Sequence, residues 1–301
     1  MENRKRRSVK DHAKETMTDL KYGDVSVQLD GNVALVEIHR PPHNYFDAQL
    51  IQDLAEAFEA MDSDHDCRAI VLASEGKSFC AGANFNAARA KRGGNEQTPP
   101  PSRQDAAVVE DNDIEADDEV ASTTSRLYQN AVRLFACSKP VVAAIQGAAI
   151  GGGFGLALVA DFRIVSPDAR FGANFVKLGI HPGFGLTYTL PRVVGIQRAT
   201  LMFYTGRRIT GEEAVAWGLG DVLAAPDRLR EEAMKLATEI AECAPLAVQS
   251  TRATMRRGLA DAVRAQTDHE HAEQSLLFQT EDHREGVRAV SERRPGRFNG
   301  R

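Results

Sequence analysis

The chain has 301 residues, of which 43% are hydrophobic and 26% are charged, and its formal net charge is −5. This composition suits a globular protein with a substantial core, organised as one large or two small domains. The acidic balance argues against nucleic acid as a partner, and no apolar run approaches the ~20 residues that span a bilayer. Residues 1–22 are rich in basic side chains without an apolar stretch, which predicts a disordered tail rather than a secretory signal.

The cysteines and histidines offer no pattern typical of a metal site. The four cysteines lie far apart and form no CxxC pair: Cys67, Cys80, Cys137 and Cys243. Such spacing indicates reduced thiols in a cytoplasmic protein, and we expect Cys80 to be a buried, inert thiol. His269 and His271 are two apart in a helical stretch, so they do not share a helix face.

The first part of the chain predicts a strand–helix–strand unit. Residues 24–40 alternate apolar and polar side chains around Asp30 and Gly31, which predicts two strands joined by a turn. Residues 48–64 carry apolar side chains at helical spacing. Residues 67–76 form a short apolar run that ends in turn residues, which predicts a buried strand and a βαβ-like beginning.

Residues 87–120 interrupt this pattern with three consecutive prolines and a run of acidic residues. A segment of this composition buries little apolar surface, so we expect a mobile, solvated insert. A lid over a site is the alternative interpretation.

The second part begins with another strand–helix unit and ends in helices. Residues 123–138 predict an amphipathic helix, 139–150 a buried strand, and 161–174 a third strand with a turn. From about residue 210 onward the pattern is helical, and Pro245 stands where a proline begins a helix. These late helices are expected to form a layer of their own or an oligomer interface.

Two glycine-rich turns each precede a helix or an apolar run, in VLASEGKSFCAGANF and VVAAIQGAAIGGGFGLAL. Glycine lets a ligand approach the main chain, and the first N–H groups of a helix are unpaired. Two converging turns would offer two N–H donors to one oxygen, which is an oxyanion hole. Phosphate binding and simple close packing explain the same pattern. The sequence lacks GxxxxGK[ST] and GxGxxG, which argues against a P-loop and a dinucleotide site.

The stretch SFCAGANF (78–85), the following KPVVAAIQGAAIGGGFGLALVADFRI and the pattern from Phe278 to Phe298 resemble the crotonase superfamily, the enoyl-CoA hydratase/isomerase family. The resemblance implies an α/β fold: a ββα spiral core over 23–210 and a C-terminal helical trimerisation region over 211–301. It also implies an acyl-CoA thioester as substrate, no cofactor beyond the coenzyme A of that substrate, and a homotrimer or a hexamer.

The resemblance also assigns site residues, and it implies that a thioester enolate is held by two backbone N–H groups. These N–H groups correspond to Ala83 and Gly152. The loop RPPHNYFD matches the coenzyme A loop of the family, and a late basic residue such as Arg293 would reach the phosphates from a neighbouring subunit. The residues expected to contact substrate or coenzyme A are Arg40, His43, Asn44, Ala81, Asn84, Phe85, Gly151, Gly155, Phe175 and Arg293.

The sequence departs from the family at the two positions where its hydratases carry glutamate. These positions hold Gly155 and Phe175, neither of which can transfer a proton. Glycine at 155 would leave space for a bulkier acyl group or for a side chain from elsewhere in the chain. His181, in LGIHPGFG, is our candidate for proton transfer, because histidine titrates near neutral pH; a hydrogen-bonding role in its loop is the alternative.

Three hypotheses follow from these residues. The first is an acyl-CoA enzyme of hydratase/isomerase type that stabilises an enolate with an unusual proton-transfer set. The second is a carbon–carbon bond hydrolase or a decarboxylase acting on a ketoacyl-CoA, cyclic in the hydrolytic case, where the oxyanion hole supplies most of the catalysis. The third is an acyl-CoA-binding homologue without catalysis.

Overall fold

A computed structural model describes residues 19–83 and 124–301, and its main element is a seven-stranded sheet. The strand order is β1-β2-β3-β4-β5-β7-β10. The bounds are β1 Asp19–Tyr22, β2 Val25–Asp30, β3 Val33–Ile38, β4 Ala69–Ser74, β5 Val141–Ile145, β7 Phe162–Val165 and β10 Val222–Leu223. The first three strands pair antiparallel and the others parallel, as successive crossovers require.

The predicted strand–helix–strand beginning is confirmed. Gly31 adopts φ +58° in the β2–β3 turn, a conformation that glycine reaches without strain. The helix α1 spans Ala48–Ser63, and the side chain of Asp47 accepts a hydrogen bond from the Leu50 N–H at its start. All six residues of β4 are buried, which explains its continuous apolar run.

The predicted single strand over 139–150 is wrong, because the chain changes sheets at Gly147. β5 lies in the large sheet, whereas β6 (Ala148–Ile150) joins β8 (Arg170–Gly172) and β9 (Arg208–Thr210) in a second sheet. A Cβ at Gly147 would stand 1.9 Å from the carbonyl oxygen of Lys77, so only glycine fits at this corner. The segment 161–174 likewise divides into β7 and β8, one strand in each sheet.

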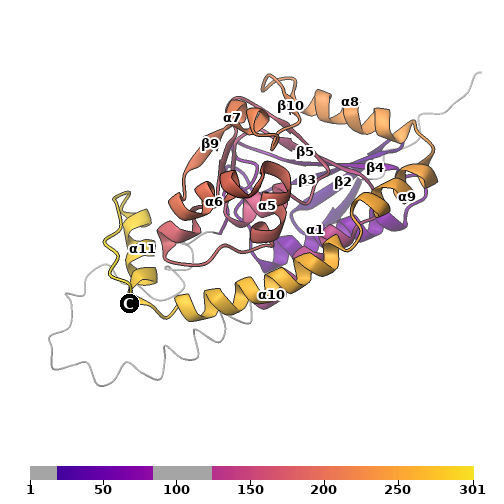
Figure 1. Ribbon diagram of the computed structural model, residues 1–301. Helices are drawn as coiled ribbons and strands as arrows, with labels where there is room; N and C mark the ends of the chain where they lie inside the picture. Colours follow the sequence, from indigo (N-terminus) through magenta and orange to yellow (C-terminus); the bar gives the residue numbers. More distant parts are fainter. Residues whose placement is uncertain (1–18, 84–123) are drawn as a thin grey trace, which may run out of the picture.

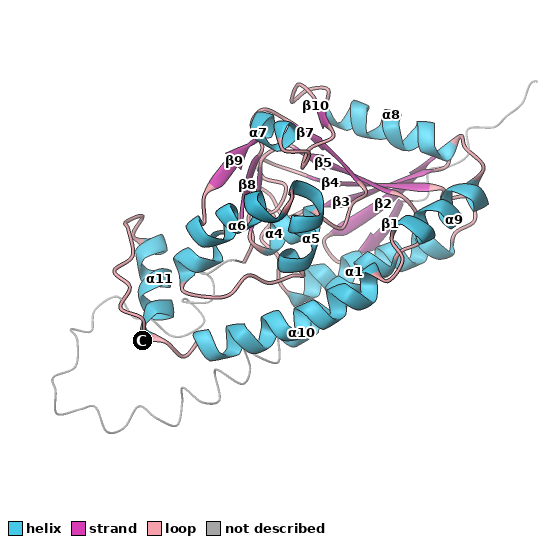
Figure 2. Cartoon of the chain, in the orientation of Figure 1, coloured by secondary structure: helices cyan, strands magenta, loops and turns pink. Residues whose placement is uncertain are grey.

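Helices cover both faces of the large sheet (Figure 1). One face packs against α1 and the helical residues 124–136 in the larger core, and the other packs against α8. Figure 2 shows α10 running along one side of the molecule, where it packs against α5. The helices beyond α1 are α4 Gly152–Ala157, the 3-10 helix η1 Asn174–Leu178, α5 Leu186–Val194, α6 Ile196–Thr205, α7 Gly211–Ala216, α8 Leu229–Ala241, α9 Pro245–Met255, α10 Leu259–Leu277 and α11 Glu281–Ser291.

Two predicted boundaries are corrected. The tail predicted over 1–22 is wrong at its end, because Asp19–Tyr22 forms β1 and pairs with β2; residues 1–18 lie outside the described part. The helical region predicted from 211 is not a separate layer at its start, because β10 extends the large sheet and α8 covers it.

Pro245 does begin α9, and Gly258, at φ +75°, separates α9 from α10. The insert predicted over 87–120 lies outside the described residues.

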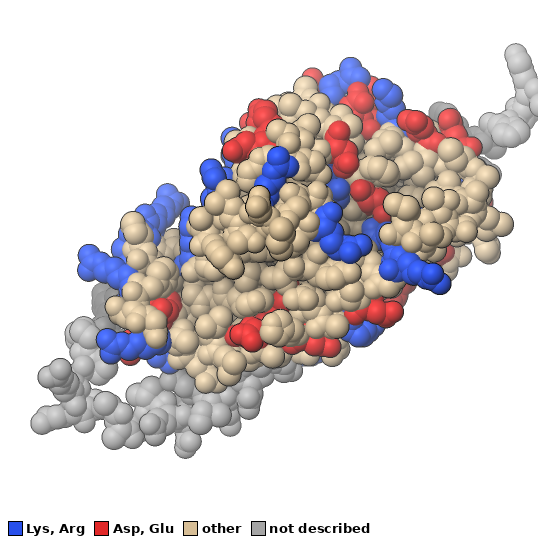
Figure 3. Space-filling model, viewed as in Figure 1, with Lys and Arg blue, Asp and Glu red and all other residues tan. Residues whose placement is uncertain are grey.

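Within the described ranges, no helix is long and apolar enough to cross a membrane. Acidic and basic side chains are interspersed over the face in Figure 3, and basic side chains gather around the end that carries α11.

Candidate active site

The structure brings the two glycine turns against each other. The Cys80 N–H donates to the Ala148 carbonyl at 2.9 Å, and the Ile150 N–H donates to the Cys80 carbonyl at 3.0 Å. A Cβ at Gly82 would stand 2.7 Å from the Ile150 carbonyl oxygen, so the turns approach as closely as glycine allows. The segments 80–83 and 148–153 therefore form one local unit.

Each turn presents a backbone N–H that has no acceptor among residues 19–83 and 124–301. Gly152 is the first residue of α4, where the N–H has no partner inside the helix. Ala83 is exposed and pairs with Phe46 in an isolated bridge, in which the Phe46 N–H donates to Gly82. Neither the Ala83 nor the Gly152 N–H donates to any residue in the described ranges. Both donors are thus available to an oxygen outside the chain.

Aromatic rings surround the second turn. A Cβ at Gly152 would stand 2.1 Å from the Phe46 ring, and one at Gly155 would stand 2.6 Å from Cδ1 of Phe184. The rings of Phe46 and Phe184 are 6.1 Å apart. Phe175 is 8% exposed and its Cζ would lie 3.7 Å from a Cβ at Gly151. Among the described groups nearest these glycines, none is a carboxylate.

Of the two occupants expected beside Gly155, the structure shows the side chain from elsewhere in the chain, because Phe184 fills the space that a bulkier acyl group would need. Phe184 is 1% exposed and adopts φ +64°, a left-handed conformation that is rare for bulky residues. Sequence reasoning missed both Phe46 and Phe184. The signal for Phe184 was its place between Gly183 and Gly185, where the chain turns sharply.

His181 lies half-buried in the loop before α5. Its Nδ1 is 2.7 Å from the Pro182 carbonyl oxygen, and this oxygen can only accept, so Nδ1 carries the proton in the neutral ring. That tautomer leaves Nε2 as an acceptor, which is the form a general base needs. The His181 ring contacts His269 edge-on at 5.9 Å.

The loop 40–47 is built by its own side chains. Asn44 is fully buried and its amide donates to the carbonyls of Glu75 and Ser78 at 2.6 and 2.7 Å. Arg40 pairs with Asp24 at 2.6 Å and with Asp47 at 3.0 Å. In this structure both side chains therefore support the loop.

The other predicted contact residues lie at several places in the chain. His43 is exposed, with Nδ1 3.4 Å from the Ser78 hydroxyl, and Ala81 and Gly151 are half-buried in the turns already described. Asn84 and Phe85 lie outside the described residues. Arg293 is exposed just beyond α11 and adopts φ +55°.

Asp161 and Cys80 serve the fold. Asp161 pairs with Arg252 at 2.8 Å and with Arg256 at 2.7 Å, and it accepts the Val141 N–H. Burial raises the pKa of Asp161, but the two guanidinium groups outweigh it and hold that pKa below its usual value. Burial raises the pKa of the Cys80 thiol to about 12, so this thiol is inert.

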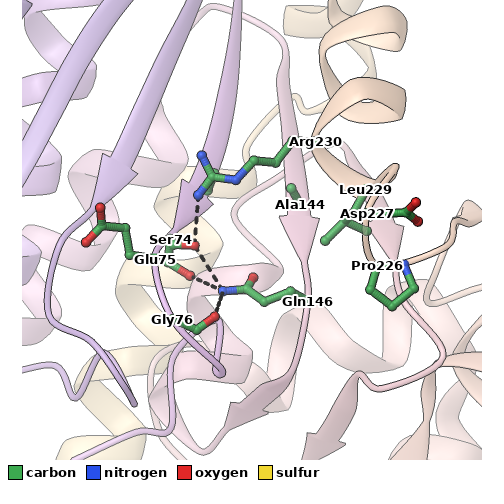
Figure 4. A pocket seen from close by; sticks show the side chains of 10 residues that line it. Ser74, Glu75, Gly76, Ala144, Gln146, Pro226, Asp227, Leu229 and Arg230 are labelled. Carbon is green, nitrogen blue, oxygen red and sulfur yellow. Dashed lines mark hydrogen bonds between the residues drawn. The ribbon is translucent and has the colours of Figure 1, made fainter.

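A pocket of about 350 Å³ opens elsewhere, at the carboxyl ends of β4 and β5 (Figure 4). Two of its side chains share one main-chain acceptor: Gln146 donates to the Ser74 carbonyl at 3.0 Å, and Arg230 donates to the same oxygen at 3.1 Å. It contains none of the predicted site residues.

Comparison with known proteins places this chain in a family. The signature of the family "Enoyl-CoA hydratase/isomerase" matches residues 28–109 and 104–301. The chain belongs to the enoyl-CoA hydratase/isomerase family. It is 33% identical to the (E)-benzylidenesuccinyl-CoA hydratase of Thauera aromatica, over 92% of this chain and 99% of that protein. It is 31% identical to the crotonyl-CoA hydratase of Syntrophomonas wolfei, over 92% and 98%.

A solved structure supports the fold. The crystal structure of an enoyl-CoA hydratase/isomerase from Pseudoalteromonas atlantica T6c superposes with a TM-score of 0.74 at 26% identity, covering 92% of this chain and 100% of that one. The predicted crotonase-type α/β fold class is confirmed, with helices at the C-terminal end. The chain is an enzyme of hydratase/isomerase type.

Proposed function

We propose that the enzyme binds an acyl-CoA thioester and stabilises its enolate in an oxyanion hole formed by the N–H groups of Ala83 and Gly152. The observation that carries the proposal is the pair of unpaired donors on two turns tied together by main-chain hydrogen bonds. Because these donors are fixed before substrate binds, they stabilise developing negative charge without reorganisation. Enolate formation transfers no electron to an acceptor, so no cofactor beyond coenzyme A is required.

The proton transfer is assigned to His181. Nε2 removes a proton from the α-carbon of the thioester, and the C–H electron pair forms the enolate whose oxygen accepts both N–H bonds. Return of the proton to another carbon gives an isomerase. Addition of water needs a further group that activates the water, and the positions implied by the family resemblance hold Gly155 and Phe175.

The aromatic surroundings favour carbon–carbon cleavage, a decarboxylation or a hydrolytic ring opening, as a second candidate. Phe46, Phe175 and Phe184 line the glycine turn, and none of the described atoms nearest to Gly151, Gly152 or Gly155 belongs to a carboxylate. In decarboxylation, the electron pair of the broken bond passes to the enolate while carbon dioxide leaves. That step requires no general base, and apolar walls disfavour the charged carboxylate of the substrate.

A panel of acyl-CoA thioesters incubated with the enzyme in D2O and analysed by mass spectrometry tests these alternatives. Deuterium uptake without addition of water supports enolate formation and isomerase chemistry. Loss of carbon dioxide, or water uptake with ring opening, supports the second candidate. An unchanged thioester across short and long enoyl-CoAs, cyclic ketoacyl-CoAs and acyl-CoAs that carry a carboxylate on the α-carbon contradicts the proposed function.

The oxyanion hole itself is tested with proline, which removes a backbone donor. Proline is compatible with the first position of a helix, where Gly152 stands. Phe46 supplies all three nearest atoms to a Cβ at that position, so the substitution is made together with Phe46→Ala. We expect Phe46→Ala/Gly152→Pro to turn over about 10²–10³-fold more slowly than the control Phe46→Ala/Gly152→Ala, which keeps the N–H. Equal rates in the two variants would refute the assignment.

We also propose a homotrimer or a hexamer. Large apolar side chains are exposed on three helices: Ile196 and Tyr204 on α6, Leu246 and Met255 on α9, and Leu276 on α10. Such surface is typical of an interface between subunits. The basic surroundings of α11 in Figure 3 support Arg293 as a contact to the coenzyme A phosphates of a neighbouring subunit. Size-exclusion chromatography with light scattering checks the oligomer, and a monomer would contradict it.

A further inference from the structure

The buried carboxylate of Glu270 joins the C-terminal helix α10 to the loop that carries His181. Glu270 is fully buried, and Oε2 accepts the Gly185 N–H at 2.7 Å. Oε1 accepts the Thr187 N–H at 3.0 Å and the Thr187 hydroxyl at 2.5 Å. Three donors at the start of α5 thus converge on one side chain, which leaves few of its acceptor sites unused.

A second residue of the same helix holds the other end of this loop. Gln274 lies one turn after Glu270, and its amide donates to the His181 carbonyl at 2.8 Å. The Tyr128 hydroxyl donates to Gln274 at 2.8 Å and packs so closely on Gly183 that a Cβ there would stand 1.9 Å from the oxygen. Residues 181–187 are therefore held at both ends from α10.

The loop held in this way carries the proposed base and an aromatic ring that lies against the glycine turn. It contains His181, the proposed base, and Phe184, whose ring covers Gly155 in a left-handed backbone conformation. A non-glycine residue keeps such a conformation only where its surroundings enforce it. The Glu270 bonds to residues 185 and 187, directly after Phe184, supply that enforcement.

We propose that Glu270 is a positioning residue, whose ionised carboxylate fixes the loop 181–187 so that His181 and Phe184 lie correctly for catalysis. The proposal rests on the proposed function. Glu270 acts through the loop, and it carries no proton to or from the substrate.

The surroundings of Glu270 make this role dependent on pH. Burial raises its pKa to about 7, although the bonds from Thr187 and Gly185 act to lower it. Tyr128 faces it from the helical residues 124–136, and His269 and His271 flank it on α10; no described lysine or arginine forms an ion pair with it. Below that pKa the protonated carboxyl has fewer acceptor sites, so the loop loosens and turnover falls.

The test compares Glu270→Gln with Asp268→Asn, which removes a negative charge from an exposed position of the same helix. In Glu270→Gln the new amide places a donor against a backbone N–H. We expect the Gly185 and Thr187 amides to exchange with deuterium at least tenfold faster, as measured by hydrogen exchange. We expect kcat for deuterium exchange into the thioester to fall at least tenfold with KM within threefold, and the acidic limb of the pH profile to lose the ionisation near pH 7 that Glu270 contributes. Asp268→Asn should match the wild type in each measurement.

Thr187→Val, which removes one donor and keeps Glu270, guards against a failure of the first variant to fold. We expect a change of about threefold in the same direction, since one of three bonds is lost. Unchanged amide exchange in both variants would overturn the proposal. Faster exchange with unchanged kcat and pH profile would also overturn it, because the role would then be structural only. If the wild type turns over no thioester, the proposed function fails, and amide exchange alone decides whether Glu270 holds the loop.

Discussion

Gly155 and Phe184 should be energetically coupled, because the ring of Phe184 fills the space beside Gly155. A Cβ at Gly155 would stand 2.6 Å from Cδ1, 2.8 Å from Cβ and 2.9 Å from Cγ of Phe184. Rotation of the ring cannot relieve a contact with Cβ. Overpacking of this kind costs about 1–3 kcal/mol, against a gain of about 1 kcal/mol from alanine in a helix. Gly155→Ala should thus change the free energy of unfolding by about 0–2 kcal/mol in the destabilising direction.

Phe184→Gly removes the whole side chain and suits φ +64°. Alone it should destabilise the fold, since the loss of a buried phenylalanine costs about 3–5 kcal/mol and relief of the left-handed conformation returns about 1–2 kcal/mol. In a protein that already carries Phe184→Gly, Gly155→Ala should leave the free energy of unfolding unchanged or raise it. The coupling energy is then about 1–3 kcal/mol, measured by urea unfolding of the double-mutant cycle at one fixed protein concentration.

Phe184→Ala provides the matched control, because it keeps the Cβ at 2.8 Å and should relieve only part of the strain. A coupling energy below about 0.5 kcal/mol would refute the reasoning, since independent sites add within that margin. The same geometry governs an attempt to install hydration. Gly155→Glu/Phe175→Glu should gain crotonyl-CoA hydration only when Phe184→Gly is added.

Three further predictions concern the fold. Asp161→Asn should destabilise the protein by about 3–5 kcal/mol in urea unfolding, because it leaves Arg252 and Arg256 buried without a carboxylate. The pKa of Asp161 is lower in the folded protein than in the unfolded chain, so its contribution to the free energy of unfolding is present above the unfolded pKa. That contribution is lost as the pH falls through the folded pKa. A free energy of unfolding that stays constant in acid would contradict this. Asp47→Ala should cost about 1 kcal/mol by removing the cap of α1, and thermal unfolding checks it. Iodoacetamide should label Cys243 alone in the native protein, because the other three thiols are buried and burial raises the pKa of each; labelling at a second site would contradict it.

The early elements could be predicted because local pattern and tertiary burial agree there. The β2–β3 turn and α1 follow from alternation and helical spacing, both within a few residues. The buried strand β4 follows from a continuous apolar run. The two glycine turns were found for the same reason, since close approach of backbones leaves glycine in the sequence.

Other features depend on contacts between distant segments, which single-sequence patterns do not contain. The apolar run over 139–150 reads as one strand, and only the carbonyl of Lys77 against Gly147 forces the change of sheet. The ring of Phe184 covers Gly155 from 29 positions further along the chain. Glu270 lies between two histidines in a helical stretch, and no local pattern indicates that it accepts the Gly185 N–H at the start of α5, 85 positions away.

The site combines two kinds of chemistry that sequence change affects differently. The proposed oxyanion donors belong to the main chain, so they persist as long as Gly82, Gly147 and the turn at Gly151 allow the backbones to meet. Acid–base groups are side chains, and one substitution each removes them. A family with this backbone arrangement can therefore change its reaction without losing its capacity to stabilise an enolate. Because Phe184 fills the space beside Gly155, we expect Gly155→Glu alone to give no gain of hydration, and coordinated substitutions at distant positions to be needed.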